Sequence, residues 1–246
     1  MQDLSLIEQP MKNTFLTQGF IKYEQLIPLD EVAEIKKHYD ALLADSNRTA
    51  HLRSDLGGNG KVGEEKITQI MCPSSLLPEL LDSLTYQNAT RQARALLGDD
   101  LILDFDMLIN KMPHTNTPTP WHQDAAYWIE LPDKRAVSCW IALEEAQEEN
   151  GCMWFIPRQD ENIRPHQAAL TGGALSCEAS LEEAICVPLD PGDCTFHDGF
   201  TLHFSKGNIT ARNRRALILN FRPQAMVALE RAQGIDHTGE RKVRQK

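Results

Sequence analysis

Two short segments, far apart in the sequence, carry residues that could bind one metal ion together. The first is Trp121-His122-Gln123-Asp124, and the second, Thr201-Leu202-His203-Phe204-Ser205, places its histidine 81 residues after His122. Two histidines and one carboxylate are the facial ligand set of non-haem Fe(II) oxygenases, which leaves three coordination positions open. We therefore predict that His122, Asp124 and His203 bind iron and form a catalytic centre.

Arg214 extends this pattern, because it follows His203 by eleven residues. In a strand it would share a face with Ala216 and Ile218. A guanidinium binds a carboxylate through two parallel N–H bonds, which give both charge and orientation. The spacing from His203 favours Arg214 over Arg212 and Arg215, which fit exposed positions. The pattern predicts an oxygenase in which a keto acid with a distal carboxylate, 2-oxoglutarate, and O2 occupy the open positions on the iron.

Each part of this pattern has an ordinary alternative. A His-x-Asp motif alone fits a solvated histidine and a capping aspartate, and His203 alone fits a core histidine. Two histidines and a carboxylate also serve catalytic zinc, so a zinc hydrolase is a second hypothesis, although no His-Glu-x-x-His motif is present. A third is a non-catalytic module that binds 2-oxoglutarate and a metal. Neither alternative explains the ordered combination with Arg214 as well as an oxygenase does.

The elements that must position these residues change type along the chain. Residues 28–46 and 75–97 have helical spacing of apolar residues, and residues 48–63 contain Gly57-Gly58-Asn59-Gly60 and predict a loop. From residue 101 onward, short apolar runs alternate with turn residues, which is typical of strands. The predicted strands are residues 101–112, 136–143, 152–156, 185–189, 194–197, 202–205 and 214–221.

Helices followed by many short strands predict a mainly β fold, with N-terminal and packing helices against a double-sheet jelly roll or barrel. We expect a single domain over residues 1–246, because β-barrels of this length are often undivided. Within it, residues 1–100 would form a mostly helical N-terminal layer and residues 101–225 the β-barrel core. Residues 226–246 are expected to form a polar C-terminal tail.

The net charge of −10 argues against a nucleic-acid-binding surface and against recruitment to anionic membranes. No run approaches the 18 apolar residues of a transmembrane helix, and the first residues lack a basic segment followed by an apolar one. These features predict a cytoplasmic protein that acts on a small molecule, without a nucleic-acid or membrane partner. They give no prediction of oligomeric state.

Several motifs together resemble one protein family. They are Trp121-His122-Gln123-Asp124, the run Ser-x-Trp-Ile-Ala-Leu at 138–143, the run Glu-Asn-Gly-Cys-Met-Trp-Phe-Ile-Pro at 149–157, and His203-x-Ser205 followed by Asn208 and Arg214. This set resembles the phytanoyl-CoA dioxygenase family over roughly residues 15–225. The resemblance implies an Fe(II)- and 2-oxoglutarate-dependent oxygenase with a double-stranded β-helix, a cupin-like barrel.

The resemblance also implies roles for individual residues. The metal ligands would be His122, Asp124 and His203, and Arg214 would bind the distal carboxylate of 2-oxoglutarate. The other implied co-substrate residues are Ser205, Gln123, Trp140, Met107 and Lys66. Trp140 and Met107 also fit core positions, and Lys66 also fits a surface lysine.

One loop departs from the family pattern. Many relatives continue Ile-Pro with Gly-Ser-His, whereas here Ile156-Pro157 is followed by Arg158-Gln159-Asp160. That loop borders the substrate entrance in the family, so the departure argues against a long-chain acyl-CoA substrate. Retention of Asp124 argues against halogenation, because halogenating relatives have a small residue there.

The expected reaction is therefore hydroxylation of an unactivated C–H bond, coupled to conversion of 2-oxoglutarate into succinate and CO2. Protein groups would contribute positioning and the exclusion of water. The candidate substrate-contacting residues are Tyr127, Trp128, Arg158 and Phe200, for which ordinary packing or a solvated charge is the alternative.

Overall fold

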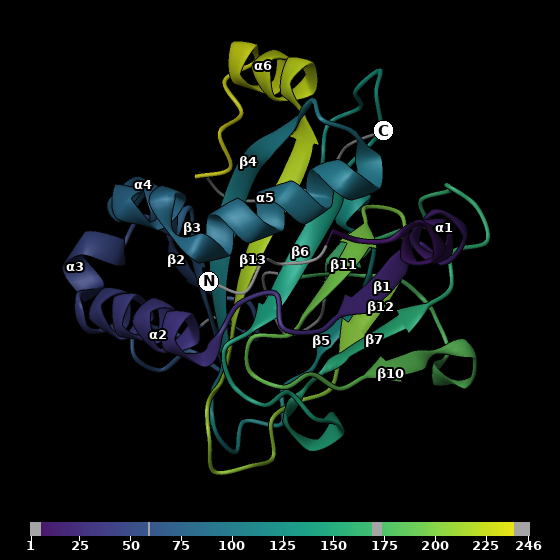
Figure 1. The fold of residues 1–246 in the computed structure, drawn as a ribbon. Helices are drawn as coiled ribbons and strands as arrows, with labels where there is room; N and C mark the ends of the chain where they lie inside the picture. Colours follow the sequence, from purple (N-terminus) through teal and green to yellow (C-terminus); the bar gives the residue numbers. More distant parts are fainter. Residues whose placement is uncertain (1–5, 59, 169–173, 239–246) are drawn as a thin grey trace.

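The computed structural model describes residues 6–58, 60–168 and 174–238. Within these residues two antiparallel sheets face each other, a seven-stranded sheet in the order β1-β11-β6-β13-β4-β3-β2 and a four-stranded sheet in the order β10-β7-β12-β5. Aromatic side chains bridge the two sheets, with the rings of Phe20 in β1 and Phe155 in β7 stacked at 4.6 Å. This arrangement, a double-stranded β-helix with flanking helices, is the fold class expected from the sequence (Figure 1).

The strands are β1 (Phe20–Tyr23), β2 (Arg53–Asp55), β3 (Ile67–Met71), β4 (Leu101–Lys111), β5 (Thr119–His122), β6 (Val137–Ala142), β7 (Met153–Ile156), β8 (Gln167–Ala168), β9 (Leu175–Ser176), β10 (Ile185–Val187), β11 (Cys194–Asp198), β12 (Leu202–Ser205) and β13 (Arg214–Pro223). The α-helices are α1 (Gln9–Gln18), α2 (Leu29–Ala44), α3 (Ser46–Thr49), α4 (Pro73–Leu76), α5 (Leu84–Leu97) and α6 (Gln224–Ala232). Short 3-10 turns occur at Pro78–Asp82, Asp124–Ala126, Glu148–Asn150 and Leu181–Glu183.

Strand β13 organises the larger sheet, because it pairs with β4 on one side and with β6 on the other. Its ten residues alternate between the two faces of the sheet. Leu217 and Leu219 face the helices, whereas Arg214, Ile218 and Asn220 face the space between the sheets, here called the barrel interior. The polar interior side chains therefore mark where the fold departs from an ordinary apolar core.

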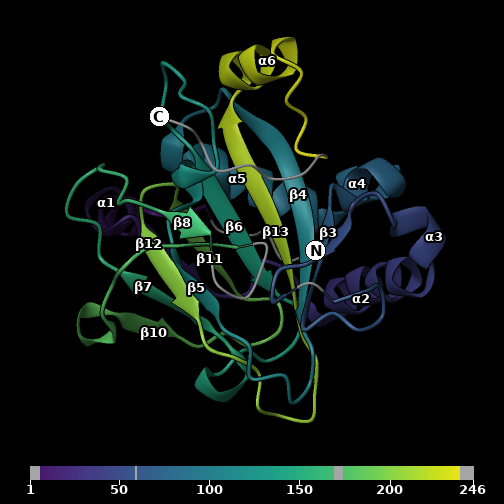
Figure 2. The same cartoon turned by 180° about the vertical axis from the view of Figure 1, so that it is seen from behind.

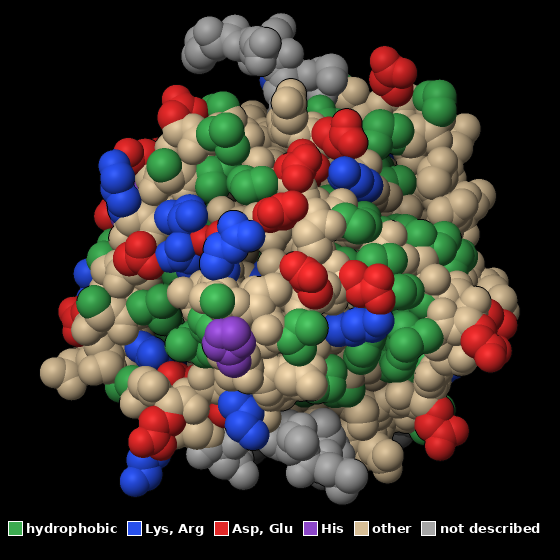
Figure 3. All heavy atoms as spheres, turned by 90° about the horizontal axis from the view of Figure 1, so that it is seen from below, with side chains coloured by type: hydrophobic (Ala, Val, Ile, Leu, Met, Phe, Trp, Pro, Cys, Tyr) green, Lys and Arg blue, Asp and Glu red, His purple; other side chains and the backbone are tan. Residues whose placement is uncertain are grey.

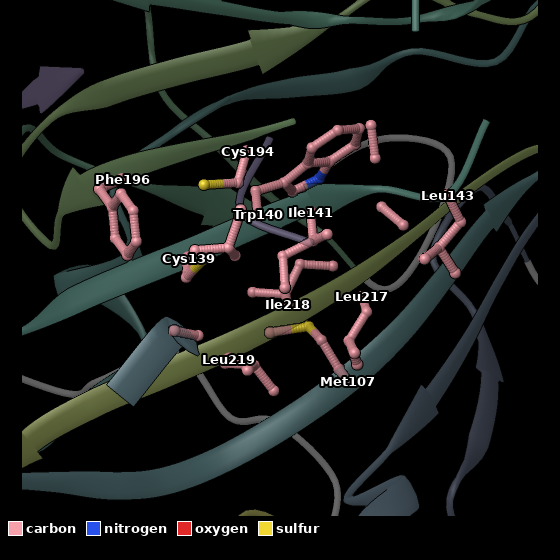
Figure 4. Packing of buried hydrophobic residues seen from close by; sticks show 14 of the residues in the cluster. Met107, Cys139, Trp140, Ile141, Leu143, Cys194, Phe196, Leu217, Ile218 and Leu219 are labelled. Carbon is pink, nitrogen blue, oxygen red and sulfur yellow. The ribbon is translucent and has the colours of Figure 1, made fainter. Parts of the chain in front are cut away.

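Helices cover the outer face of the larger sheet, so that both of its faces are buried. Helix α5 contacts β4, β6 and β13, and α2 lies beside it, whereas the smaller sheet lies on the opposite side (Figures 1 and 2). Ser83 caps α5 by accepting a hydrogen bond from the Tyr86 backbone N–H, and Gly98 ends the helix at a positive φ of 126°. Figure 4 shows the apolar packing at the sheet, where Ile218 is in register with both Trp140 and Met107.

The seven predicted strands are all present, and α2 lies within the predicted helix at 28–46. The predicted helix at 75–97 is divided, because Pro78 begins a 3-10 turn and α5 starts only at Leu84. The N-terminal layer is less helical than expected, since β1, β2 and β3 all join the larger sheet. These are runs of three to five residues, too short for periodicity to distinguish strand from loop.

The predicted boundary of the polar tail at residue 226 falls inside helix α6. Met226, Val227 and Glu230 of this helix are buried, so the segment packs on the ends of β4 and β13. Residues 226–232 therefore belong to a packed helix and not to a polar tail, whereas residues 233–238 have no helix or strand and are half-buried or exposed. Helix α6 has only two buried apolar positions, which is a weak helical signal in a polar stretch.

The surface is mixed in charge on the face seen in Figure 3. Acidic and basic side chains are interspersed there, so this face presents no continuous basic surface. No helix in the described part of the chain is long and apolar enough to cross a lipid bilayer.

Candidate metal centre and anion-binding site

His122, Asp124 and His203 come together in the barrel interior. His122 ends β5 and His203 lies directly opposite it on β12, with the two rings 4.1 Å apart. Asp124 follows two residues after His122, and one ligand atom from each of the three side chains lies within 4.8 Å of the others. The three side chains are buried or half-buried. This is a donor set that suits a divalent transition metal with open coordination positions.

The route by which Asp124 reaches this cluster differs from the sequence-based argument. Strand alternation was expected to place His122 and Asp124 on one face, but β5 ends at His122 and Asp124 begins a 3-10 turn. The backbone N–H of Ala125 donates to the carbonyl of Gly199 at 2.9 Å, which fixes this turn beside the residues that precede β12. The carboxylate therefore converges on the histidines through a turn rather than along a strand.

Backbone carbonyls orient both imidazoles. The Nδ1 of His122 lies 2.8 Å from the carbonyl of Pro120, and the Nδ1 of His203 lies 3.0 Å from the carbonyl of Thr201. Because a carbonyl only accepts, each Nδ1 carries the proton and each Nε2 presents a lone pair. Burial lowers the pKa of His122 and lowers the pKa of His203 further. Both rings are thus held neutral and aimed as metal ligands require.

The two oxygens of Asp124 have different surroundings. Oδ1 lies 3.9 Å from the Nε2 of His122 and 3.8 Å from the Nε2 of His203. Oδ2 accepts a hydrogen bond from the Ser138 hydroxyl at 2.9 Å, and Asn220 donates to that hydroxyl at 2.9 Å. Burial acts to raise the pKa of Asp124, but a hydrogen bond from His197 and the nearby imidazoles outweigh it and lower the pKa. The carboxylate is therefore ionised, with Oδ1 free to bind a metal.

Arg214 lies at one end of the barrel interior and is almost fully buried, with 1% of its surface exposed. Its guanidinium carbon lies 5.0 Å from the centre of the Trp140 ring. Among the residues that the structure describes, its Nε and Nη1 have no hydrogen-bond partner. Burial lowers the pKa of Arg214 to about 10, so it remains charged at neutral pH. A buried cation with free donors is a site for an anion.

Lys111 is a second buried basic group at this end of the barrel, and the sequence analysis missed it. It pairs with Arg214 across β4 and β13, and its Nζ donates to the carbonyls of Thr117 at 3.0 Å and Ser205 at 3.4 Å. Burial and the charge of Arg214 lower the pKa of Lys111 well below its usual value. Lys111 continues the alternating face formed by Phe105, Met107 and Ile109, which is the signal that could have found it.

Three other predicted co-substrate residues lie in the barrel interior. Trp140 packs under the Arg214 guanidinium, so it is both a core aromatic and a wall of the anion site. Ser205 is buried two residues after His203 and shares its face. Met107 is buried on β4, where it is in register with Ile218 of β13. Its sulfur accepts a hydrogen bond from Gln69. All three therefore belong to the same barrel interior as the metal cluster and Arg214.

Gln123 and Lys66 do not join this group. The Gln123 amide nitrogen donates to the carbonyls of Asn162 at 2.9 Å and Phe200 at 2.7 Å, and its oxygen accepts from the backbone of Arg164. Its amide therefore fastens the loop at 162–166 and is not left to bind a co-substrate. Lys66 is exposed just before β3, and the structure gives its ammonium no contact with the described site residues.

A pocket of about 930 Å³ opens next to the metal cluster. Residues of the segments 125–136 and 161–166, together with Phe200 and Arg222, line it. The three candidate ligands do not line it themselves, but its wall begins at Ala125, directly after Asp124. Trp128 lies over the Arg222 guanidinium at 3.9 Å, and Lys134 lies 6.0 Å from the centre of the Phe200 ring. The predicted substrate residues Trp128 and Phe200 are thus pocket residues.

The other two predicted substrate residues have different places. Tyr127 packs edge-on against His122, with ring centres 6.0 Å apart, and its hydroxyl accepts a hydrogen bond from the backbone of Leu175. Arg158 does not itself line the pocket: its Nε lies 2.8 Å from Asp198, its Nη2 donates to the carbonyl of Leu16 at 2.9 Å, and its Nη1 donates to the pocket residue Glu161 at 3.2 Å. Arg158 therefore anchors α1 and the segment before β12, and its role as a substrate contact stays a prediction.

Comparison with known proteins agrees with this geometry. The sequence model of the Phytanoyl-CoA dioxygenase (PhyH) family matches residues 15–216. The Bos taurus protein named phytanoyl-CoA dioxygenase domain-containing protein 1 is 24% identical over 248 residues, which is 82% of this chain and 85% of that protein. A segment of 117 residues is 45% identical to the Danio rerio protein of the same name, covering 44% of this chain and 40% of that one.

Solved structures share the fold. EvdO2 from Micromonospora carbonacea var. aurantiaca, crystallised with 2-oxoglutarate, superposes with a TM-score of 0.72 at 29% identity, over 90% of this chain and 93% of that one. EctD from S. alaskensis, solved with 2-oxoglutarate and 5-hydroxyectoine, has a TM-score of 0.69 at 24% identity, over 89% of this chain and 77% of that one. The second likeness, at this identity, is one of fold alone.

Proposed function

Because this chain belongs to the phytanoyl-CoA dioxygenase family, whose members use Fe(II), 2-oxoglutarate and O2, we propose that it hydroxylates an unactivated C–H bond of a small organic substrate. The balanced reaction consumes the substrate, 2-oxoglutarate and O2, and yields the hydroxylated product, succinate and CO2. One oxygen atom of O2 enters the product and the other enters succinate. No external reductant is needed, because 2-oxoglutarate supplies the two electrons that complete the reduction of O2.

His122, Asp124 and His203 would hold the iron, since Nε2 of His122, Oδ1 of Asp124 and Nε2 of His203 already converge. When bound, the iron would supply the activation of O2 that side chains cannot provide. The protein's own contribution is geometric. The two neutral imidazoles and the ionised carboxylate are held in fixed positions, which would leave the remaining coordination positions of the metal open. The apolar walls around Trp140 and Phe155 exclude water.

The observation that carries the proposal is the buried Arg214 guanidinium with two unbonded nitrogens. A buried charge without a counter-ion costs stability, so it is kept where a ligand supplies the opposite charge. A dicarboxylate that bound the metal through its keto-acid end would place its second carboxylate toward Arg214. Trp140 would pack along the chain between the two ends, and Ser205 would face it from β12.

The same observation weighs against the two alternatives. A zinc hydrolase on this barrel would use the three ligands but would leave the Arg214 and Trp140 pair without a role. A non-catalytic binding module would use both the metal and the anion site, yet it would give no reason for a pocket of about 930 Å³ that begins beside Asp124. The oxygenase accounts for the metal cluster, the anion site and the pocket together.

The pocket also bears on the substrate. Its volume is in the range of sites for drug-sized ligands, about 300–1,000 Å³, and its wall combines Trp128, Phe200 and aliphatic residues with Lys134, Arg164 and Arg222. We therefore favour a compact organic molecule with both apolar and polar groups over a long-chain acyl-CoA.

Calorimetric titration with 2-oxoglutarate tests the proposal without knowledge of the substrate. The reconstituted protein, loaded anaerobically with Fe(II), should bind 2-oxoglutarate in a metal-dependent manner, whereas His122→Ala should lose most of this binding. A panel of small metabolites should then contain compounds that stimulate succinate formation. Equal 2-oxoglutarate binding with and without metal, or in the His122→Ala variant, would overturn the proposal.

A further inference from the structure

A third histidine, His197, lies beside the metal cluster and has no place in the ligand set described above. It is on β11, where it is in register with Ser138 of β6, and only 2% of its surface is exposed. Its ring lies 4.6 Å from the ring of His203 and 5.3 Å from that of Phe155. Its Nε2 lies 3.4 Å from Oδ2 of Asp124.

Oδ2 of Asp124 therefore has two neighbouring donors from adjacent strands. Ser138 donates its hydroxyl proton at 2.9 Å, and the His197 ring approaches the same oxygen from β11. The other oxygen, Oδ1, faces the Nε2 atoms of His122 and His203 instead. The carboxylate is thus held in one orientation, with one oxygen occupied by protein donors and the other directed at the metal position.

The surroundings of His197 also indicate which ring nitrogen carries the proton. Its Nδ1 is buried and has no hydrogen-bond partner in the described part of the chain. A buried donor without a partner is less tolerable than a buried acceptor without one. Proton placement on Nε2 leaves only an acceptor unpaired and lets Nε2–H donate to Asp124, so the geometry favours Nε2 over Nδ1 as the ring donor.

We propose that His197 is a positioning residue for the metal centre, which acts through Asp124. Together with Ser138 it ties Oδ2 to the protein, so that Asp124 binds the metal through Oδ1 alone. Binding through a single oxygen leaves the coordination positions that the co-substrate and O2 require. This inference rests on the proposed metal centre. It adds His197 as the residue that makes Asp124 bind the metal through one oxygen.

Two simpler roles give different expectations. If His197 only filled space between Phe155 and His203, a ring of similar size without a donor would serve equally well. If His197 were itself a metal ligand, its loss would be as damaging as the loss of His122. Positioning predicts an intermediate loss that a different side chain with an N–H donor repairs.

The test is a Co(II) titration of the purified metal-free protein, followed by the visible absorption of the bound ion, which reports coordination geometry. The variants are His197→Phe, which removes the donor, and His197→Gln, which keeps one. Thr195→Val is the matched control, because Thr195 is buried two residues away on the same strand and face, and no hydrogen bond joins it to Asp124 in the described structure. His122→Ala is measured alongside, and thermal unfolding confirms that each variant is folded.

We expect His197→Phe to weaken Co(II) binding about 10- to 100-fold, the usual effect of removing a group that orients a ligand, and to change the visible spectrum. His197→Gln should recover most of the affinity, and Thr195→Val should bind as the unchanged protein does. If His197→Phe does not fold, His197→Leu replaces it in the same comparison.

Unchanged affinity and spectrum in the variant without a donor would overturn the positioning role. A loss as complete as that of His122→Ala would also overturn it, because it would make His197 a ligand. If His122→Ala itself binds Co(II) normally, the metal centre fails and the proposal for His197 fails with it. Loss in His122→Ala together with normal binding in His197→Phe leaves the metal centre intact and removes only this inference.

Discussion

Arg214 and Lys111 stand directly opposite each other on strands β13 and β4, so two buried basic side chains meet at one end of the barrel interior. Lys111 donates to two backbone carbonyls, whereas Arg214 keeps two nitrogens without a partner among the described residues. The pair therefore has two functions in one place. Lys111 joins the surrounding segments, and Arg214 remains available to an anion.

Replacing Arg214 should weaken 2-oxoglutarate binding without lowering the stability of the ligand-free protein. Arg214→Met removes the carboxylate contact, so the dissociation constant of 2-oxoglutarate should rise roughly 10- to 100-fold, as expected for a charge-assisted hydrogen bond worth about 1.5–3 kcal/mol. The same change removes an unpaired buried charge, so without ligand the variant should be at least as stable as the parent. Calorimetry and thermal unfolding measure the two effects. A variant that binds 2-oxoglutarate normally would refute the anion site.

Lys111 should matter for stability, unlike the exposed Lys66. Lys111→Met leaves the carbonyls of Thr117 and Ser205 without their donor, which should cost about 1–3 kcal/mol of unfolding free energy. Lys66→Met is the matched control and should change neither stability nor 2-oxoglutarate affinity. Chemical denaturation and calorimetry report both quantities. A tenfold weaker 2-oxoglutarate affinity in Lys66→Met would instead favour the co-substrate role that the sequence resemblance implies.

His237 should make stability depend on pH. Burial opposes its protonation, but hydrogen bonds to Asp104 and Glu230 outweigh burial and raise its pKa. The charged ring, 3.2 Å from Asp104, thereby links the segment after α6 to β4. Because the folded-state pKa is raised, this stabilisation is complete below the unfolded pKa of about 6.5 and is lost as the pH rises through the folded value.

The measurement is thermal unfolding of the parent and of His237→Gln between pH 5.5 and 9, where Asp104 stays ionised because its pKa is about 2. The difference in Tm between the two proteins should be largest at the acidic end and shrink toward pH 9. Arg222 and Arg231 also face Asp104, at 3.4 and 2.7 Å. The control substitution is His51→Gln, at an exposed histidine. A His237→Gln difference that grows with pH would contradict this account.

Arg158 should behave as an anchor for the chain rather than as a substrate contact. Its Nε lies 2.8 Å from Asp198, and burial raises the pKa of Asp198 while Arg158 opposes that rise. A double-mutant cycle with Arg158→Ala and Asp198→Asn should show a coupling energy of about 0.5–3 kcal/mol in unfolding experiments. Once a substrate is known, its KM should change little in Arg158→Lys. A large KM change without loss of stability would restore the substrate role.

The metal ligands could be proposed from the sequence because each lies in a short motif, and the two motifs and Arg214 follow one another in a distinctive order. His122 and Asp124 are two residues apart, and Arg214 follows His203 by eleven residues. The strands after residue 101 were also predictable, since short apolar runs alternate with turn residues. Even so, the turn at Asp124 was not foreseen, because a two-residue offset is compatible with a strand and with a tight turn alike.

The groups around the ligands were not predictable, because they depend on which strands become neighbours. His197 and Ser138 meet only through the pairing of β11 with β6, and nothing in their own segments indicates it. Gln123 was assigned to the co-substrate by its position in the motif, whereas its hydrogen bonds are to backbone groups 39 to 77 residues away. Long-range contacts of this kind follow from topology, which a single sequence constrains only loosely.

The central claim is that His122, Asp124 and His203 form an iron site to which 2-oxoglutarate binds with its far end at Arg214. The most direct measurement is the anaerobic visible absorption spectrum of the protein with Fe(II) and 2-oxoglutarate. The account predicts a weak metal-to-ligand charge-transfer band that is absent in His122→Ala and that requires a higher 2-oxoglutarate concentration in Arg214→Met. No band in the unaltered protein, or an equal band in His122→Ala, would contradict it.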